Sequence, residues 1–172
     1  MPNGNPENTK FKETRVWEIL AEIPDPEIPV LTILDLGIVR KVEFHDEKPI
    51  ITITPTYSGC PAMQRFEKDI VEAMEQNGFE GTEVPMIYEP AWTTDWITEK
   101  GRRKLKEYGI APPEETTANK KALFFENDIV TVTCPRCNSK NTKLESQFGS
   151  TACKALYKCN DCLEPFEYFK CL

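Results

Sequence analysis

Two C-x-x-C pairs constrain this chain more than any other feature of its sequence. They are Cys134-Pro135-Arg136-Cys137 and Cys159-Asn160-Asp161-Cys162, with 21 residues between them. A spacing of two residues lets one tight turn direct both sulfurs at one metal ion, and two such turns close a tetrahedral site. The pattern therefore predicts a four-cysteine metal site formed by Cys134, Cys137, Cys159 and Cys162.

The ligand type narrows the choice of metal. A closed site of four cysteines is typical of structural Zn²⁺, because catalysis needs an open coordination position. The same thiolates also suit iron or a transient Fe–S cluster. Two further thiols, Cys153 and Cys171, lie near the pairs in sequence. They are interpreted as additional ligands of the site, as a loosely held second thiol pair, or as small packed side chains.

Composition and charge limit where the protein works and what it binds. The sequence contains no apolar stretch typical of a signal peptide or a membrane span, so we expect a cytoplasmic protein without a membrane partner. Thiols stay reduced in the cytoplasm, which favours metal ligands over disulfides. Residues 1–119 carry 13 Lys and Arg against 22 Asp and Glu. A body with this net charge of −9 argues against nucleic-acid binding, which needs a concentrated basic surface.

Apolar periodicity predicts two main helices. The first covers 11–23, with Thr9 as its N-cap, after a flexible leader at 1–10. The second covers 61–77, with Pro61 in its first turn and Gly78 as its C-terminal cap. Its apolar stripe consists of Met63, Phe66, Ile70 and Met74.

The remaining patterns predict short elements. We expect strands at 38–45, 50–54 and 82–88, with a hairpin turn at 45–49 between the first two. A short helix interrupted by Gly101 is expected within 91–108, and its basic run 102–106 is interpreted as a solvated face.

A linker is expected at 111–121. After it, short strands at 129–133, 155–158 and 166–169 surround the cysteine pairs, the layout of a zinc ribbon whose C-x-x-C turns sit at hairpin tips.

The seventh cysteine, Cys60, stands apart from the others. It directly precedes the helix predicted at 61–77, where free N–H groups and the positive end of the helix dipole favour a thiolate. Gly59 allows another molecule to approach closely. The alternative interpretation is a capping or buried cysteine. His45, the single histidine, lies in a polar turn, so a Cys-His hydrolase is poorly supported.

Polar residues could complete a site around Cys60. Asp25 and Glu27 lie in a proline-bounded loop, and Thr56 and Ser58 lie just before the thiol. Acidic residues in such loops commonly cap turns. If the loop folds over the start of the helix, Asp25, Glu27, Thr56 and Ser58 would instead line the site of Cys60.

Several motifs together resemble a known family. Asp25-Pro26-Glu27-Ile28-Pro29, Asp35-Leu36-Gly37-Ile38-Val39 and Thr56-Tyr57-Ser58-Gly59-Cys60-Pro61 are similar to the metal-sulfur cluster assembly domain of SufT-like proteins. Glu89-Pro90-Ala91-Trp92, the segment 149–157 and Phe169-Lys170-Cys171 are similar to the PaaD (PaaJ) family of phenylacetyl-CoA epoxidase accessory proteins.

The resemblance implies a fold and a division of the chain. The fold class is α+β, a small sheet flanked by helices followed by a C-terminal β zinc ribbon. The implied domains are the leader 1–10, an assembly domain at 11–110, the linker 111–121 and a four-cysteine zinc-ribbon domain at 122–172.

The resemblance also implies a function in aerobic phenylacetate degradation. Such a protein assists assembly of an Fe–S or iron centre in the epoxidase, with Cys60 as the functional thiol. The implied partners are epoxidase subunits, above all the reductase subunit, which carries flavin and an Fe–S cluster. The sequence offers no pair of Glu-x-x-His motifs and no dinucleotide fingerprint, so we expect no enzyme. The alternative is a non-catalytic structural subunit of the oxygenase complex.

Overall fold

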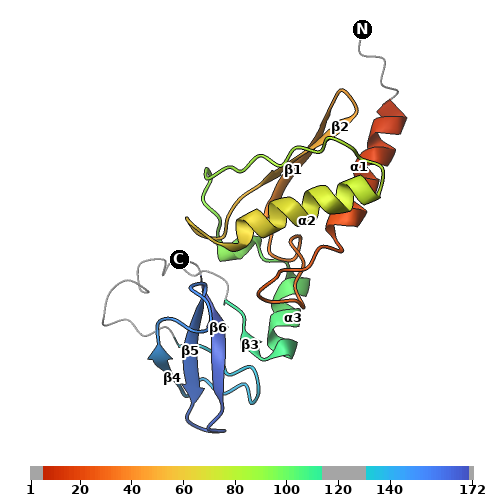
Figure 1. The fold of residues 1–172 in the computed structure, drawn as a ribbon. Helices are drawn as coiled ribbons and strands as arrows, with labels where there is room; N and C mark the ends of the chain where they lie inside the picture. Colours follow the sequence, from red (N-terminus) through yellow and green to blue (C-terminus); the bar gives the residue numbers. More distant parts are fainter. Residues whose placement is uncertain (1–5, 114–130, 171–172) are drawn as a thin grey trace. The chain divides into compact units, whose positions relative to one another are not determined.

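The computed structural model describes residues 6–113 and 131–170, with side chains from Lys10 onward. The chain forms two compact units, residues 1–92 and residues 93–172. The division between Trp92 and Thr93 lies upstream of the predicted linker at 111–121. Of that linker, only residues 111–113 are described. Figure 1 shows the elements of each unit.

Unit 1 begins with the helix α1 (Pro6–Leu20). The helix starts before the predicted Phe11, so Thr9 lies inside it and is not its N-cap, and residues 6–10 of the expected leader are helical. It ends at Leu20, not at Ile23, whose N–H instead donates to the Leu20 carbonyl in a tight turn. Val16 and Leu20 are fully buried, in agreement with the apolar periodicity from which the helix was predicted.

The predicted hairpin is present as β1 (Val39–His45) and β2 (Lys48–Ile53), which pair in antiparallel fashion. Asp46 and Glu47 form its two-residue turn, both with positive φ, the geometry that suits the twist of a tight hairpin. The His45 side chain is 79% exposed, which confirms the predicted exposure, but the residue ends β1 and the turn itself consists of Asp46 and Glu47. Ile51 and Ile53 of β2 are fully buried.

Residues 82–88, predicted as a third strand, form no strand although all of them lie in the described part of the chain. Only isolated parallel bridges join this segment to β2, between Ile50 and Glu83 and between Ile53 and Met86. Pro85 lies between the two bridges and has no N–H to donate, so a continuous ladder cannot form. The segment still extends along β2, where the Ile53 N–H donates to the Pro85 carbonyl at 3.0 Å.

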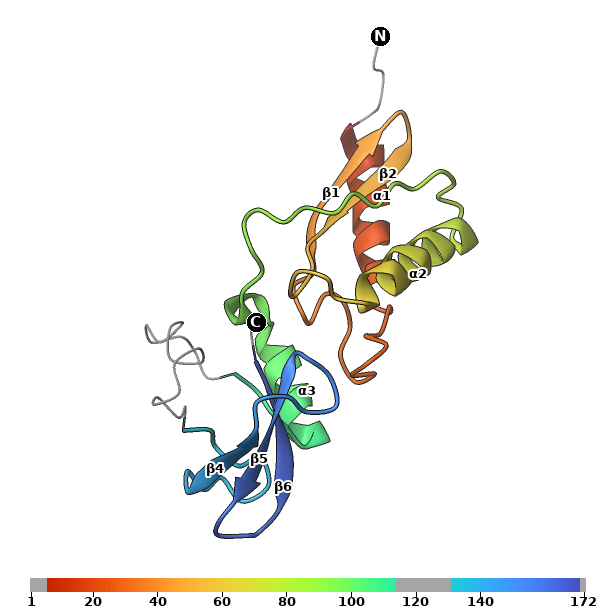
Figure 2. The same ribbon diagram turned by 60° about the vertical axis from the view of Figure 1, so that its left-hand side comes forward.

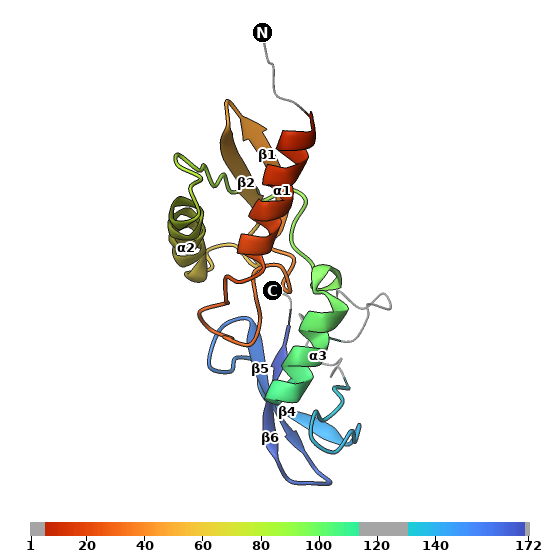
Figure 3. The same cartoon turned by 90° about the vertical axis from the view of Figure 1, so that its right-hand side faces the viewer.

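The second predicted helix is α2 (Ala62–Gln76), with Pro61 at its N-cap position. The predicted stripe is confirmed, because its members are all at least 96% buried: Met63, Phe66, Ile70 and Met74. Gly78 follows the helix with φ +83°, the left-handed conformation that a C-terminal cap requires. Helices α1 and α2 lie beside the β1–β2 hairpin in two perpendicular views (Figure 1, Figure 3).

Unit 2 begins with the short 3-10 helix η1 (Thr94–Trp96) and the helix α3 (Glu99–Tyr108). Gly101 does not interrupt α3 as predicted. It lies in the first turn, where its N–H donates to the Thr98 hydroxyl at 3.0 Å, so the glycine is stabilised by the N-cap. Gly109, with φ +94°, ends the helix.

The sheet of unit 2 has the strand order β3-β6-β5-β4 (Figure 1), and Figure 2 shows its strands β4, β5 and β6 from another side. The strands are β3 (Ile110–Ala111), β4 (Thr142–Ser146), β5 (Lys154–Cys159) and β6 (Pro165–Phe169). β5 and β6 match predicted strands. β4 was not predicted, and residues 131–133 of the strand expected at 129–133 are not a strand, whereas residues 129–130 lie outside the described residues.

Aromatic rings fill the small core of unit 2. The fully buried Tyr157 ring lies 6.0 Å from Phe166 and 5.7 Å from Tyr168, measured between centroids. Two of the predicted ligands, Cys134 and Cys159, are part of this core. A core of this size gives limited stability on its own, and metal coordination would therefore contribute to folding.

Candidate functional site

The four cysteines of the C-x-x-C pairs come together in unit 2. Their Sγ atoms all lie within 4.8 Å of one another. Cys134 Sγ and Cys162 Sγ are 3.8 Å apart, and Cys137 Sγ and Cys159 Sγ are 3.5 Å apart. A tetrahedral ion with Zn–S bonds of about 2.3 Å separates its sulfurs by about 3.8 Å. The donor set and its dimensions therefore fit one four-coordinate metal ion, as predicted.

The first cysteine pair lies on a compact turn before β4. The Cys134 N–H donates to the Ser139 carbonyl at 2.9 Å, and the Asn138 N–H donates to the Cys134 carbonyl at 3.0 Å. Asn138 has φ +61°, which reverses the chain directly after Cys137. The second pair connects β5 to β6, where the Cys159 N–H donates to the Glu164 carbonyl at 2.9 Å. Only this second pair sits at a hairpin tip as expected.

The protein environment prepares Cys159 to act as a thiolate. Backbone N–H groups of Cys162 and Asp161 donate to its sulfur, and together with the neighbouring thiols they lower the pKa of Cys159 to about 7. The Ser139 N–H donates to the sulfur of Cys137 and by itself would lower the pKa of that thiol. Two effects outweigh this donor, the desolvation of the sulfur and its hydrogen bonds with the other thiols. Together they raise the pKa of Cys137 to about 12, although the residue is exposed. A dication binding here would replace the protons shared among these sulfurs.

Side chains tie the two cysteine turns together. Asp161, inside the second pair, accepts hydrogen bonds from Ser139 Oγ at 2.5 Å and Asn141 Nδ2 at 2.7 Å, both just after the first pair. Arg136, inside the first pair, bonds Glu164 beyond the second at 2.7 Å. These links fix the relative position of the turns, an arrangement that was not predicted from the sequence. The sequence did contain a signal for these links, namely the polar residues inside and just after each C-x-x-C pair.

Cys60 lies in unit 1, one residue before the N-cap of α2. It is partly exposed. Its N–H donates to the Tyr57 carbonyl at 3.2 Å, and its own carbonyl accepts from the Met63 N–H at 3.3 Å. Gly59 has φ +80°, and apart from its two chain neighbours no atom of the described residues lies within 4 Å of the place where a Cβ would stand. The thiol is therefore carried by a turn with open space beside it.

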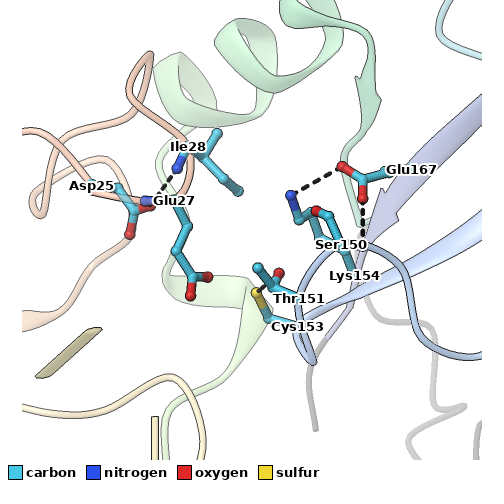
Figure 4. Close-up of polar contacts among 8 residues, drawn as sticks. All are labelled: Asp25, Glu27, Ile28, Ser150, Thr151, Cys153, Lys154 and Glu167. Atoms are coloured by element: carbon cyan, nitrogen blue, oxygen red, sulfur yellow. Dashed lines mark hydrogen bonds and ion pairs between the residues drawn. The ribbon is translucent and has the colours of Figure 1, made fainter. Parts of the chain in front are cut away.

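The acidic loop before β1 has the turn-capping role that its sequence indicated. Asp25 is 93% buried, and its Oδ1 accepts hydrogen bonds from the backbone N–H of Glu27 at 2.8 Å and of Ile28 at 2.6 Å (Figure 4). The loop lies beside the first turn of α2 in two perpendicular views (Figure 1, Figure 3). Thr56 is half-buried and Ser58 is exposed in the segment before Cys60. A shared site of these residues with Cys60 stays a prediction.

Cys153 occupies a separate environment. It directly precedes β5, whose other end carries Cys159, so the two residues are separated by about 20 Å of extended chain. Its sulfur contacts Thr151 Oγ1 at 3.1 Å, and the side chain is buried. These contacts agree with a packed thiol outside the four-cysteine cluster. The other spare thiol, Cys171, lies outside the described residues.

A buried ion pair beside Cys153 was also not predicted from the sequence. Lys154 Nζ lies 3.0 Å from Glu167 Oε2, and Glu167 Oε1 accepts the Ser150 N–H at 2.8 Å (Figure 4). The signal available in the sequence was the presence of two lysines, Lys154 and Lys158, in the apolar pattern of β5. The pair fixes the loop between β4 and β5, which contains the first part of the segment 149–157 that carried part of the family resemblance.

Comparisons with known proteins identify the two parts of the chain. Residues 13–85 match the model of an iron-sulfur cluster assembly protein, and residues 118–170 match that of the PaaD zinc beta ribbon domain. An Escherichia coli K12 protein, named as one subunit of a "Putative 1,2-phenylacetyl-CoA epoxidase", is 54% identical over 157 residues, which cover 91% of this chain and 92% of that protein. The chain belongs to the PaaD family.

The fold agrees with a solved structure. A domain of unknown function, DUF59, from Bacillus anthracis covers 59% of this PaaD-family chain and 97% of its own, with a TM-score of 0.55 and 24% identity. That likeness establishes the α+β fold. PaaD-family membership confirms the resemblance drawn from Cys60-Pro61, Trp92 and the segment 149–157. In the described part of the chain, no helix has the length and apolar character to cross a membrane.

Proposed function

We propose that this PaaD-family protein is a non-enzymatic maturation factor that assists assembly of an Fe–S or iron centre in phenylacetyl-CoA epoxidase. The observation that carries the proposal is Cys60, a partly exposed thiol on an open turn, inside the segment that matches the iron-sulfur cluster assembly family. We place this activity in the cytoplasm, where thiols stay reduced and able to bind metal.

Cys60 would hold the cargo during transfer. Its thiol loses a proton to solvent when the sulfur–iron bond forms, and it regains a proton when the iron or cluster passes to the client. Gly59 leaves room for the client to approach. Glu27, Thr56 and Ser58 would line the site, and Asp25 would act through its hydrogen bonds to the loop backbone.

The four-cysteine site would hold Zn²⁺ and have a structural role. All four ligand positions come from the protein, so no coordination position remains for a substrate. Cys134 and Cys159 also belong to the core, so the ion would stabilise the unit in which it is bound. The unit would then be available to bind the client, for which we propose the Fe–S reductase subunit of the epoxidase.

Replacing Cys60 tests this function. The epoxidase reductase subunit is co-produced anaerobically with the wild-type protein, with Cys60→Ala or with Cys60→Ser, and its iron, sulfide and visible spectrum are measured. We expect cluster occupancy to fall to the level without any PaaD-family protein for Cys60→Ala, and to stay low for Cys60→Ser. His45→Ala, at an exposed residue that ends β1, is the control and should keep full occupancy. Unchanged occupancy with Cys60→Ala would rule out the proposed role of the thiol.

A second candidate function follows from the name of the Escherichia coli relative, which calls it a subunit. In that case the protein would be a non-catalytic structural component of the oxygenase complex. The two candidates differ in stoichiometry. A maturation factor is absent from the purified active epoxidase, whereas a structural subunit stays at a constant ratio to the other subunits through successive chromatography steps.

A further inference from the structure

One face of α3 borders a cavity of about 380 Å³ within unit 2. The helix contributes Glu99, Arg102, Arg103 and Lys106, at the spacing i, i+3, i+4 and i+7 that places side chains on one face. Pro113 and Pro135 line the cavity from other parts of the unit. The basic run that we interpreted from sequence as a solvated face therefore forms one wall of a cavity.

The charges around this cavity are unbalanced. Among the described residues that line it, three side chains are cationic and one, that of Glu99, is a carboxylate. Among the described residues, neither Arg103 nor Lys106 forms an ion pair that would neutralise it. Neighbouring like charges repel, and an anion that binds between them removes that repulsion. The imbalance therefore favours a negatively charged ligand.

Arg102 is held in a fixed position at this cavity. Its guanidinium donates one hydrogen bond to the Pro113 carbonyl and another, at 2.7 Å, to the Thr94 carbonyl. The side chain is half-buried, whereas Arg103 and Lys106 are more exposed. A guanidinium held by two carbonyls loses little further freedom when an anion binds, which is the physical basis of preorganised recognition.

The size and the wider charge distribution agree with an anionic organic ligand. A volume of about 380 Å³ lies within the range of roughly 300–1,000 Å³ common to small-molecule sites. Residues 93–172 carry 13 Lys and Arg against 11 Asp and Glu, whereas residues 1–92 carry 8 against 17. An anion is therefore attracted to this unit and repelled by the charge of the other. The prolines provide apolar walls for the body of the ligand.

We propose that this cavity, the α3 pocket, is an oxyanion-binding site that receives a phosphate or carboxylate group of a small organic ligand. Arg103 and Lys106 bind the oxygens directly at the rim. Arg102 supplies a fixed positive charge deeper in the pocket. None of the four cysteine ligands lines this pocket, although Pro135 lies between Cys134 and Cys137 in sequence. The proposal does not depend on the proposed maturation function.

The test uses the full-length, metal-loaded protein labelled with ¹⁵N. Inorganic phosphate and succinate are titrated separately at constant ionic strength, with chloride as the matched salt. We expect saturable shifts of α3 amides and Arg side-chain signals with at least one oxyanion and none with chloride. Tighter binding of phosphate assigns the site to phosphorylated ligands, and tighter binding of succinate assigns it to carboxylates.

Variants on the same helix make the test specific. Arg103→Gln and Lys106→Gln should each weaken oxyanion binding about threefold to tenfold, because each removes one direct charge-assisted contact. Lys100→Gln makes the same charge change on α3 at a residue that does not line the pocket, and it should leave the affinity unchanged. Shifts that match those of chloride, or an equal loss of affinity in Lys100→Gln, would overturn the proposal.

Discussion

Lys154 and Glu167 form an ion pair across β5 and β6, with Nζ and Oε2 3.0 Å apart and the lysine side chain only 6% exposed. A buried ammonium that loses its partner keeps its desolvation cost and loses the attraction that offset it. We expect Glu167→Gln to lower the free energy of unfolding of unit 2 by about 2 kcal/mol at pH 7, since the partial exposure of Glu167 moderates the effect. Glu145→Gln, which removes the exposed partner of Lys143, is the control and should change stability by less than about 1 kcal/mol. Equal effects of the two substitutions in chemical denaturation would contradict this prediction.

The contribution of Glu167 depends on pH. Burial acts to raise its pKa, but hydrogen bonds from Ser150 and Lys154 outweigh burial and hold the pKa of Glu167 below its usual 4.5. A carboxyl with a depressed pKa in the folded state stabilises that state above pH 4.5, and its contribution is lost as the pH falls through the folded-state value. The stability difference between wild type and Glu167→Gln should therefore shrink below about pH 4.5. The comparison is made only at pH values where metal analysis shows the ion still bound, because its release would unfold unit 2 in both proteins.

The carboxylate of Glu167 also leaves too little room for a side chain at Gly149. A Cβ at this position would stand 2.9 Å from Glu167 Oε1, which Ser150 and Lys154 hold in place. Gly149→Ala should therefore cost about 1–3 kcal/mol in the free energy of unfolding. In a Glu167→Ala background the obstructing oxygen is gone, and the cost of Gly149→Ala should fall below about 0.5 kcal/mol. Additive effects in this double-mutant cycle would show that the close contact is not the cause.

Structural features that depend only on residues close together in the chain could be predicted from the sequence. Two intervening residues suffice to bring Cys134 and Cys137 to one ion, and the stripe from Met63 to Met74 follows from the helical period. The prediction of a third strand at 82–88 was wrong because Pro85, within an otherwise suitable pattern, lacks the N–H that a continuous ladder with β2 would need. Gly101 was given too much weight because the cap at Thr98 was not recognised.

Features that depend on strand pairing could not be predicted in this way. Lys154 and Glu167 are 13 positions apart and meet only because β5 and β6 pair with a particular register. Asp161 reaches Ser139 and Asn141 because β4 pairs with β5 in the register that places Thr142 opposite Cys159. The α3 pocket could not be predicted either. The helical period shows which side chains of α3 share a face, but the opposite wall is formed by Pro113 and Pro135, which approach α3 only in the folded unit.

The link between Asp161 and the first cysteine turn should control how long the metal stays bound. Asp161→Ala removes the acceptors of Ser139 Oγ and Asn141 Nδ2 and frees the turn whose N–H groups point at Cys159. We expect metal release to become about tenfold faster, in the range seen when groups that orient metal ligands are lost. Transfer of the ion to the chromogenic chelator 4-(2-pyridylazo)resorcinol measures the rate. Asp161→Asn is the matched control, since its amide can accept from Asn141 and donate to Ser139, and its rate should stay near that of the wild type. A wild-type release rate in Asp161→Ala would show that the link has no such role.

Removing the metal should unfold unit 2 and leave unit 1 folded. The core of unit 2 contains Cys134 and Cys159. When the ion is lost, these cysteines become protonated thiols, and the coordination bonds that held the two cysteine turns together are gone. Unit 1 has a separate core, with Leu20, Ile51 and Ile70 fully buried, and none of the four clustered thiols. We expect a chelator under reducing conditions to collapse the amide signals of residues 131–170 in a ¹H–¹⁵N spectrum, while those of α1, α2 and the β1–β2 hairpin keep their positions. Metal analysis before chelation should find one equivalent of zinc and no visible absorption. Persistence of the signals of β5 and β6 without metal would contradict the structural role of the ion, and iron with visible absorption would contradict its assignment as zinc.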